Sequence, residues 1–179
     1  MRALLVIDVQ EGLLQLTDSN QTVASIKQIM NDFQAKKEPI IAMRHFDEAE
    51  GSPVQKGTSG VNLHPDIEAN VDHIVEKQTP SAFFNTSLQP LLEQLKIDHV
   101  TIVGYNTEFC CQFTAIAAYD RGYQVTFIEE ATGTVNTAED YELPDLNVQD
   151  FVETVLHQSG VIEVLNLEEY QDHYKPIHT

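Results

Sequence analysis

The sequence predicts an α/β fold of three layers, in which helices cover both faces of a doubly wound, mainly parallel sheet. Short runs that suit buried strands alternate along the chain with segments of helical apolar spacing. A strand, a helix and a strand in succession require right-handed crossovers, which make neighbouring strands parallel. The 179 residues, of which 42% are apolar, are enough for one sizeable core. We therefore expect a single domain over residues 1–179.

Six short runs have the length and composition of buried strands. The first is apolar throughout and ends before Asp8, and the fourth ends before Gly104. The fifth begins after Arg121-Gly122, which ends the preceding helical segment. In chain order, the predicted strands are residues 3–7, 39–43, 71–76, 100–103, 124–128 and 161–165.

Four segments have the apolar spacing of amphipathic helices. In the first, Val23, Ile26 and Met30 recur on one face. The predicted helices are residues 22–36, 87–95, 108–120 and 148–158. Residues 46–65 and 131–147 show no sustained period and are expected to be long loops, which in compact domains are often functional.

The chain is strongly acidic, because 28 Asp and Glu residues stand against 10 Lys and Arg, a net charge of −18. Such a surface repels phosphate backbones and anionic lipids, so neither nucleic acid nor a membrane is an expected partner. The two cysteines, Cys110 and Cys111, are adjacent and cannot form a long-range disulfide. The apolar run after Arg2 is too short for a signal peptide or a membrane span. We expect a cytoplasmic protein.

Residues 98–115 combine a strand, a glycine and the start of a helix that carries a thiol. Thr107, three residues before Cys110, has the position of a helix N-cap. Cys110 would then lie in the first turn, where free N–H groups and the helix dipole favour a thiolate and lower the cysteine pKa below about 8.5. This placement is typical of a reactive cysteine, and the alternative is a small apolar side chain that fills the elbow.

Three polar residues follow or end predicted parallel strands. Asp8 closes the first strand, Lys77 the third, and Cys110 follows the fourth. Because ligands of open parallel sheets bind at the carboxyl ends of the strands, a carboxylate, an ammonium group and a thiol are expected to converge there. Taken singly, Asp8 also suits a turn cap, and Lys77 suits a solvated lysine at a strand end.

Three motifs in order resemble the isochorismatase-like cysteine hydrolase family, which includes nicotinamidases, N-carbamoylsarcosine and ureidoacrylate amidohydrolases, and isochorismatases. The motifs are LVIDVQ (5–10), EK (76–77) with SAF (81–83), and GYNTEFCC (104–111). The resemblance covers roughly residues 2–165 and implies a Rossmann-like α-β-α fold. It also implies a triad of Cys110, Asp8 and Lys77, an oxyanion hole of backbone N–H groups at Asn106 and Cys110, and a cis peptide bond between Tyr105 and Asn106.

The sequence departs from the family pattern beside the nucleophile. Cys111 stands where Val is usual, and Asn106 stands where a small apolar residue is common. Neither change removes a triad member, but Asn106 is expected to narrow or polarise the pocket.

The metal site of nicotinamidases, an Asp-x-His pair with a further His after the second strand, has no match in spacing here. The corresponding stretch reads RHFD (44–47), and His64 follows further on. We expect His45, Asp47 and His64 to be surface or pocket-lining residues, with no metal and no other cofactor.

The residue types and the resemblance together predict hydrolysis of a small amide or carbamoyl substrate through a thioester. Cys110 would attack the carbonyl carbon, Asp8 would accept and return the proton, and Lys77 would stabilise both anions. Three alternatives stay open. The protein could be an isochorismatase-type enzyme that hydrolyses a vinyl ether by acid catalysis, a catalytically silent binding or interaction module, or a thiol redox protein. The adjacent cysteines are the only feature that indicates the redox protein.

Side chains that flank the motifs are expected to line the substrate pocket, although each also suits the core. They are Gln10, Leu14, Arg44, His45, Phe83, Tyr105, Asn106 and Phe109. The helix after Cys110 presents Phe113, Ile116 and Tyr119 at spacings that suit a core or a subunit interface. We therefore expect a homo-oligomer, a dimer or a tetramer.

Overall fold

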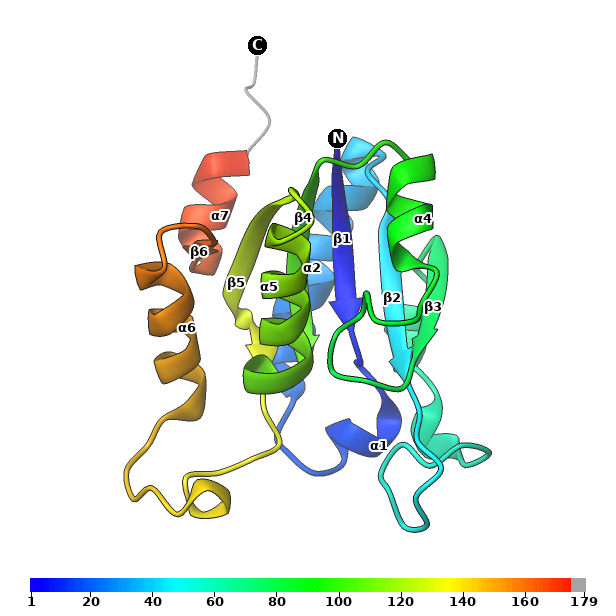
Figure 1. Ribbon diagram of the computed structural model, residues 1–179, viewed down its shortest axis with the longest axis vertical. Helices are drawn as coiled ribbons and strands as arrows, with labels where there is room; N and C mark the ends of the chain where they lie inside the picture. Colours follow the sequence, from blue (N-terminus) through cyan, green and yellow to red (C-terminus); the bar gives the residue numbers. More distant parts are fainter. Residues whose placement is uncertain (175–179) are drawn as a thin grey trace.

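A six-stranded parallel sheet forms the middle layer of the computed structural model, which describes residues 1–174 (Figure 1). The strands stand in the order β3-β2-β1-β4-β5-β6, and every neighbouring pair is parallel. In chain order they are β1 (Arg2–Ile7), β2 (Ile40–His45), β3 (His73–Lys77), β4 (His99–Tyr105), β5 (Gln124–Gly133) and β6 (Glu163–Leu165). The doubly wound sheet that the sequence predicts is therefore confirmed.

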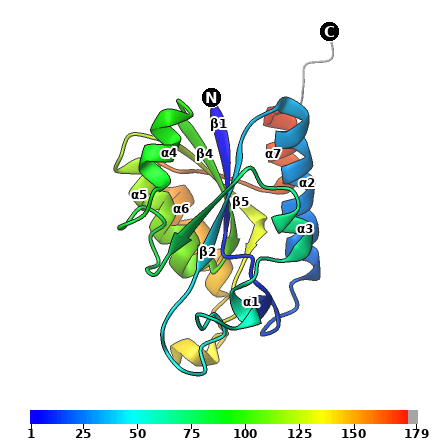
Figure 2. The same cartoon turned by 90° about the vertical axis from the view of Figure 1, so that its right-hand side faces the viewer.

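Helices cover both faces of the sheet (Figure 2). The helices on one face are α4 (Leu88–Gln94), α5 (Gln112–Tyr119) and α6 (Val148–Gln158). Those on the other face are α2 (Asn20–Lys36), α3 (Pro65–Glu68) and α7 (Leu167–Tyr174), and the short α1 (Glu11–Leu14) lies at the lower edge. Each face has its own apolar cluster, to which alternate residues of the strands contribute, as the two-residue period of a strand requires. Among residues 1–174, no helix has the length and apolar character needed to cross a bilayer.

Differences from the predicted elements concentrate where the apolar pattern is weak. β5 runs to Gly133 rather than to residue 128, because the half-buried Glu129 and Glu130 interrupt its apolar run without ending the strand. Helices α1 and α3 have four residues each, too few to show a period. Helix α7 was not predicted either, since Tyr170 is its one buried residue. Two 3₁₀ turns, Ser59–Val61 and Glu139–Tyr141, lie in the predicted loops.

Strands β1 and β4 leave no room for a side chain at Gly104, which lies beside Ile7. Its φ is +124°, and a Cβ at this position would lie 2.0 Å from the carbonyl oxygen of Ile7, so only glycine fits. Strand order reverses between β1 and β4, and such a switch point is where open α/β sheets form a ligand crevice. The close approach therefore brings together the residues that follow Ile7 and those that follow Gly104.

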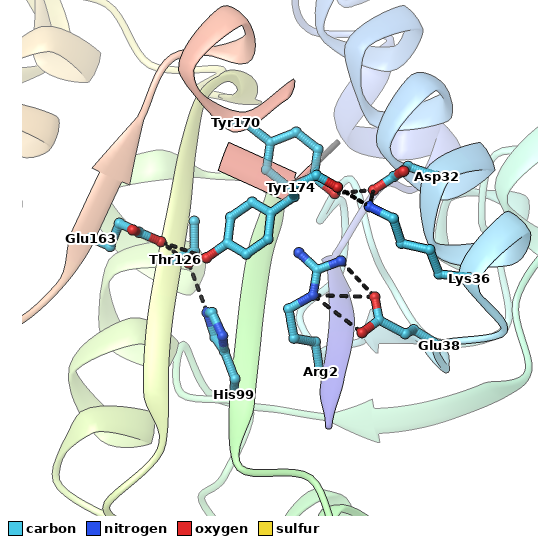
Figure 3. Close-up of polar contacts among 9 residues, drawn as sticks. All are labelled: Arg2, Asp32, Lys36, Glu38, His99, Thr126, Glu163, Tyr170 and Tyr174. Atoms are coloured by element: carbon cyan, nitrogen blue, oxygen red, sulfur yellow. Dashed lines mark hydrogen bonds and ion pairs between the residues drawn. The ribbon is translucent and has the colours of Figure 1, made fainter. Parts of the chain in front are cut away.

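A polar cluster at the opposite edge, which we call the C-terminal clasp, fastens α7 to the sheet (Figure 3). Arg2 pairs with Glu38 at 2.6 Å, and its guanidinium lies 4.8 Å and 4.2 Å from the ring centroids of Phe33 and Tyr174. The hydroxyl of Tyr174 donates to Glu163 at 2.8 Å. One aromatic ring thus joins the first strand to the last helix.

The clasp has a second connection, to α2. The hydroxyl of Tyr170 donates to Asp32 at 2.7 Å, and Lys36 pairs with the same carboxylate at 2.8 Å. The Lys36 ammonium also donates to the carbonyl oxygen of Tyr174. The two tyrosines of α7 therefore bond to α2, through Asp32, and to β6, through Glu163.

The clasp predicts that the ring of Tyr174 matters more to stability than its hydroxyl. Tyr174→Phe keeps the ring over Arg2 and is expected to lower the free energy of unfolding by about 1 kcal/mol, the value of one hydrogen bond. Tyr174→Ala also removes the ring burial and the cation–π contact, for a total loss of about 2–4 kcal/mol. Urea unfolding followed by circular dichroism measures both. Equal losses would show that the ring contributes nothing.

Candidate active site

Three of the predicted site residues meet at the carboxyl edge of the sheet. Asp8 directly follows β1, Lys77 ends β3, and Cys110 lies in a π-helical turn, Thr107–Cys111, that follows β4. Lys77 Nζ lies 2.6 Å from Asp8 Oδ2 and 3.2 Å from Cys110 Sγ. The structure therefore contains the cluster that the strand ends predict.

Lys77 is the centre of this cluster. The side chains of Lys77 and Asp8 are 0% and 1% exposed, so the solvated lysine considered from the sequence is excluded. Nζ also lies 3.2 Å from His45 Nδ1 and donates to the carbonyl oxygen of Thr79 at 3.1 Å. Burial alone would lower the pKa of Lys77, but the charge of Asp8 and the contact with Cys110 outweigh burial and raise it. The resting side chain is an ammonium ion.

Asp8 adopts a left-handed backbone conformation, with φ at +50°. Asp tolerates this region better than most residues, and such conformations cluster at functional sites. Its N–H donates to the carbonyl oxygen of Met43 at 3.2 Å, and its own carbonyl accepts from the N–H of Gln10 at 2.8 Å. Oδ1 is buried and has no hydrogen-bond partner within residues 1–174. Asp8 thus offers an acceptor inside the cluster, and its carboxylate contributes to raising the pKa of Cys110.

The prediction of a lowered Cys110 pKa is wrong for the resting site. Burial, followed by the Asp8 carboxylate, raises the pKa of the thiol to about 12, and the opposing effect of Lys77 is smaller. The helix-dipole argument failed because it left out burial, which is the largest cause, and the Asp8 carboxylate, which already neutralises Lys77. A thiolate would therefore add a net negative charge to a buried site.

The elbow between β4 and α5 also differs from the predicted capped α-helix. The turn is π-helical, and the N–H of Cys111 donates five residues back, to the carbonyl of Asn106, at 3.1 Å. Asn106, not Thr107, precedes the first turn. Thr107 is fully buried, and its hydroxyl donates to Thr132 at 3.1 Å instead of capping the helix. The peptide bond between Tyr105 and Asn106 is cis, as the family resemblance implies.

The two adjacent thiols lie in different surroundings. Cys110 is half-buried beside Lys77, whereas Cys111 is fully buried in the apolar cluster that includes Ala115 and Phe127. Burial raises the pKa of Cys111 well above its ordinary value. This divergence follows from the rotation between successive helical residues. Only Cys110 is placed for chemistry with the strand-end residues.

The structure separates the predicted pocket residues into two groups. Phe109 is 40% exposed, Leu14 is half-buried, and His45 contacts Lys77. Gln10 is instead fully buried, and its side-chain amide bonds at 2.8 Å to both the N–H and the carbonyl of His45. Gln10 therefore positions the end of β2 rather than facing open space.

Phe83, Tyr105 and Arg44 also have structural contacts. Phe83 stacks on Tyr123 with 6.0 Å between ring centroids, under the guanidinium of Arg121. Tyr105 packs on the other face of the sheet, where a Cβ on Gly133 would approach its ring to 2.7 Å. Its surroundings there include a polar cavity of about 480 Å³ that no triad residue lines. Arg44 pairs with Glu76 at 2.8 Å.

The residues considered as metal ligands lie in separate contacts. His45 lies beside Lys77, Asp47 accepts from the hydroxyl of Ser52 at 2.6 Å, and His64 Nδ1 accepts from the first turn of α3 at 3.3 Å. Within residues 1–174, no three His, Cys, Asp or Glu side chains are grouped as metal ligands. Burial, together with the charge of Lys77, lowers the pKa of His45, so the imidazole is neutral.

Sequence reasoning missed Glu108, a buried acidic residue two positions before Cys110. Its carboxylate bonds to three side chains between 26 and 33 residues away. An acid inside a buried elbow is a signal that the sequence contains, but the partners are too distant along the chain to be predicted from spacing.

Comparison with known proteins identifies the fold and the family. The model of the isochorismatase domain family matches residues 2–159. Nicotinamidase 3 of Arabidopsis thaliana is 29% identical over 148 residues, which cover 75% of this chain and 74% of that protein. A solved isochorismatase homologue from Burkholderia xenovorans LB400 has 30% identity and a TM-score of 0.85, covering 97% of this chain and 87% of its own. The nicotinamidase of Staphylococcus aureus has 27% identity and a TM-score of 0.73, and the match covers 91% of this chain and 96% of that one. The chain belongs to the isochorismatase family of hydrolases.

Proposed function

We propose that the chain is a cysteine-dependent hydrolase of small amide or carbamoyl substrates. The observation that carries the proposal is the position of Lys77 Nζ, 3.2 Å from Cys110 Sγ and 2.6 Å from Asp8 Oδ2. A nucleophile, an acid–base group and a cation thus share one buried cluster, as acyl transfer through a thioester requires. Relatives named nicotinamidase and maleamate amidohydrolase support the same bond class.

The first step is a proton transfer within the cluster. Movement of the Cys110 proton to Oδ1 of Asp8 leaves the net charge unchanged, because Lys77 then pairs with the thiolate instead of the carboxylate. No extra charge is added to the buried site, which lowers the cost of making the thiolate. A thiol with a pKa of about 12 can therefore act near neutral pH without releasing its proton to solvent.

The thiolate then forms a C–S bond with the substrate carbonyl carbon. Backbone N–H groups of Asn106 and Cys110 stabilise the oxyanion. As the C–N bond breaks, Asp8 gives its proton to the departing amine. Asp8 next removes a proton from the water that attacks the thioester, and returns that proton to the thiolate when the carboxylic acid leaves.

We further propose that Phe109, His45 and Leu14 contact the substrate. Because an ammonium ion can only donate, the ring nitrogen of His45 that faces Lys77, Nδ1, carries no proton, and the neutral imidazole carries its proton on Nε2. That N–H is then available to a substrate oxygen. Gln10 holds the backbone of His45 in place through two hydrogen bonds. The free thiols suit a reducing compartment such as the cytoplasm.

Substrate turnover tests the choice of nucleophile. Ammonia release from a panel including nicotinamide and maleamate should be abolished by Cys110→Ala, whereas Cys111→Val should stay within a few-fold of wild type because valine fills a similar buried volume. Exhaustive chelation should leave the rate unchanged, since the thiolate and the oxyanion donors supply the catalysis. Cleavage of a vinyl ether that survives Cys110→Ala would favour isochorismatase-type chemistry, and no turnover of any substrate would favour a silent binding module.

The charge balance predicts opposite effects of Asp8→Asn on two reactions. Turnover should fall by about 10²–10⁴-fold, because the acid–base group is lost. Alkylation of Cys110 by iodoacetamide at pH 8 should become faster, because removing the carboxylate lowers the thiol pKa while Lys77 still stabilises the thiolate.

The pH dependence of alkylation provides the control. The wild-type rate should rise about tenfold per unit from pH 8 to 10 without levelling, since the thiol pKa of about 12 lies above that range. In Asp8→Asn the rise should level off at a lower pH. Equal slowing of alkylation and turnover in this variant would contradict the proposed proton transfer.

We also propose that the chain is a homo-oligomer. Phe113, Ile116 and Tyr119 of α5 are 50%, 44% and 44% exposed, so they do not serve the core of one chain. Adjacent exposed apolar groups favour burial by a second copy. Sedimentation equilibrium at micromolar concentration should give a multiple of 20.1 kDa, and Ile116→Asp should shift it toward the monomer. A monomeric wild-type chain would exclude the proposal.

A further inference from the structure

Glu108 connects the nucleophile elbow to a distant segment of the chain. It lies two residues before Cys110 and is 8% exposed. Its Oε1 accepts from Thr134 Oγ1 at 2.7 Å, from Asn136 Nδ2 at 2.7 Å and from the hydroxyl of Tyr141 at 2.9 Å. One buried carboxylate oxygen therefore gathers three donors of residues 134–141. We call this group the Glu108 clamp.

The two residues before Glu108 bond to the same part of the chain. Asn106 Oδ1 accepts from the N–H of Val135 at 3.1 Å, and the hydroxyl of Thr107 donates to Thr132 at 3.1 Å. Three consecutive elbow residues are thus tied to residues 132–141. The first of them, Asn106, carries one of the two proposed oxyanion donors, so these hydrogen bonds restrain the residue whose N–H is that donor.

Stability alone does not account for a carboxylate at this position. Among residues 1–174, Glu108 forms no ion pair with a lysine or arginine, and its Oε2 is buried without a hydrogen-bond partner. Burying a carboxylate without a cation is unfavourable, and hydrogen bonds offset only part of the cost. What the charge adds is strong, short and directional hydrogen bonds from the three donors.

We infer that Glu108 is a positioning residue, which holds the N–H groups of Asn106 and Cys110 where the substrate oxyanion forms. The role rests on the proposed cysteine chemistry, because it concerns the same site. The physical claim concerns the geometry of the elbow, so it can also be measured without a substrate.

Two variants of Glu108 separate position from stability. Glu108→Ala removes the clamp and should lower kcat by about 10²-fold, the loss expected when an oxyanion donor is misplaced, with KM within about threefold. Glu108→Gln keeps a carbonyl oxygen that accepts from the same donors through weaker, uncharged bonds, so its kcat should lie between those of Glu108→Ala and wild type, within about fivefold of wild type. The matched control is Tyr174→Phe, which weakens the C-terminal clasp at the opposite edge and should leave both constants unchanged.

Alkylation of Cys110 by iodoacetamide at pH 8 supplies the second measurement. Glu108→Ala should raise this rate at least tenfold while turnover falls, because a released elbow lets the thiol leave Asp8 and titrate closer to its free value of about 8.5. Glu108→Gln and Tyr174→Phe should alkylate like wild type. The inference is overturned if Glu108→Ala keeps kcat within threefold of wild type. It is also overturned if the turnover and alkylation rates of this variant change only in proportion to its folded fraction. If wild type hydrolyses no amide, the proposed function fails while alkylation still tests the clamp.

Discussion

The buried ion pair between Asp8 and Lys77 is the constraint on which the site depends. It joins the ends of β1 and β3 across β2, and solvent reaches neither side chain. Removing one partner would leave an unpaired buried charge, at a cost of about 3–5 kcal/mol. Any third group inside the cluster must therefore be neutral at rest. A thiol meets that condition, and in the proposed mechanism it becomes a nucleophile when its proton moves to Asp8.

The geometry around this pair comes from the sheet rather than from flexible loops. Gly104 lets β4 approach Ile7 closely. The next residue after Ile7, Asp8, turns the chain out of β1 through its left-handed backbone conformation. Gln10 then fixes the end of β2 through the backbone of His45. These contacts place the reactive atoms at the point where strand order reverses, where open parallel sheets form their crevice. Rigid strands thus set the distances that the proposed chemistry needs.

Local pattern and motif order predict the sheet, the main helices and the convergence of Asp8, Lys77 and Cys110. They do not predict quantities that depend on several distant groups at once. The predicted direction of the Cys110 pKa shift was wrong because the helix terminus is a local feature, whereas burial and the Asp8 carboxylate, which raise the pKa, come from the tertiary fold. Phe83 shows the same limit, since only the tertiary fold decides that its ring stacks on Tyr123 instead of facing a ligand.

The acidic surface affects both the release of the proposed product and the charge state of the resting site. A net charge of −18 produces a negative potential around the molecule, although salt screens it beyond about 8 Å. A neutral amide approaches this surface without a charge penalty. The carboxylate formed by hydrolysis is repelled, which favours its release. The same potential stabilises the ammonium of Lys77 and opposes a resting thiolate, so it acts in the same direction as the pair with Asp8. Surface charge and buried charge therefore both favour the neutral thiol in the resting site.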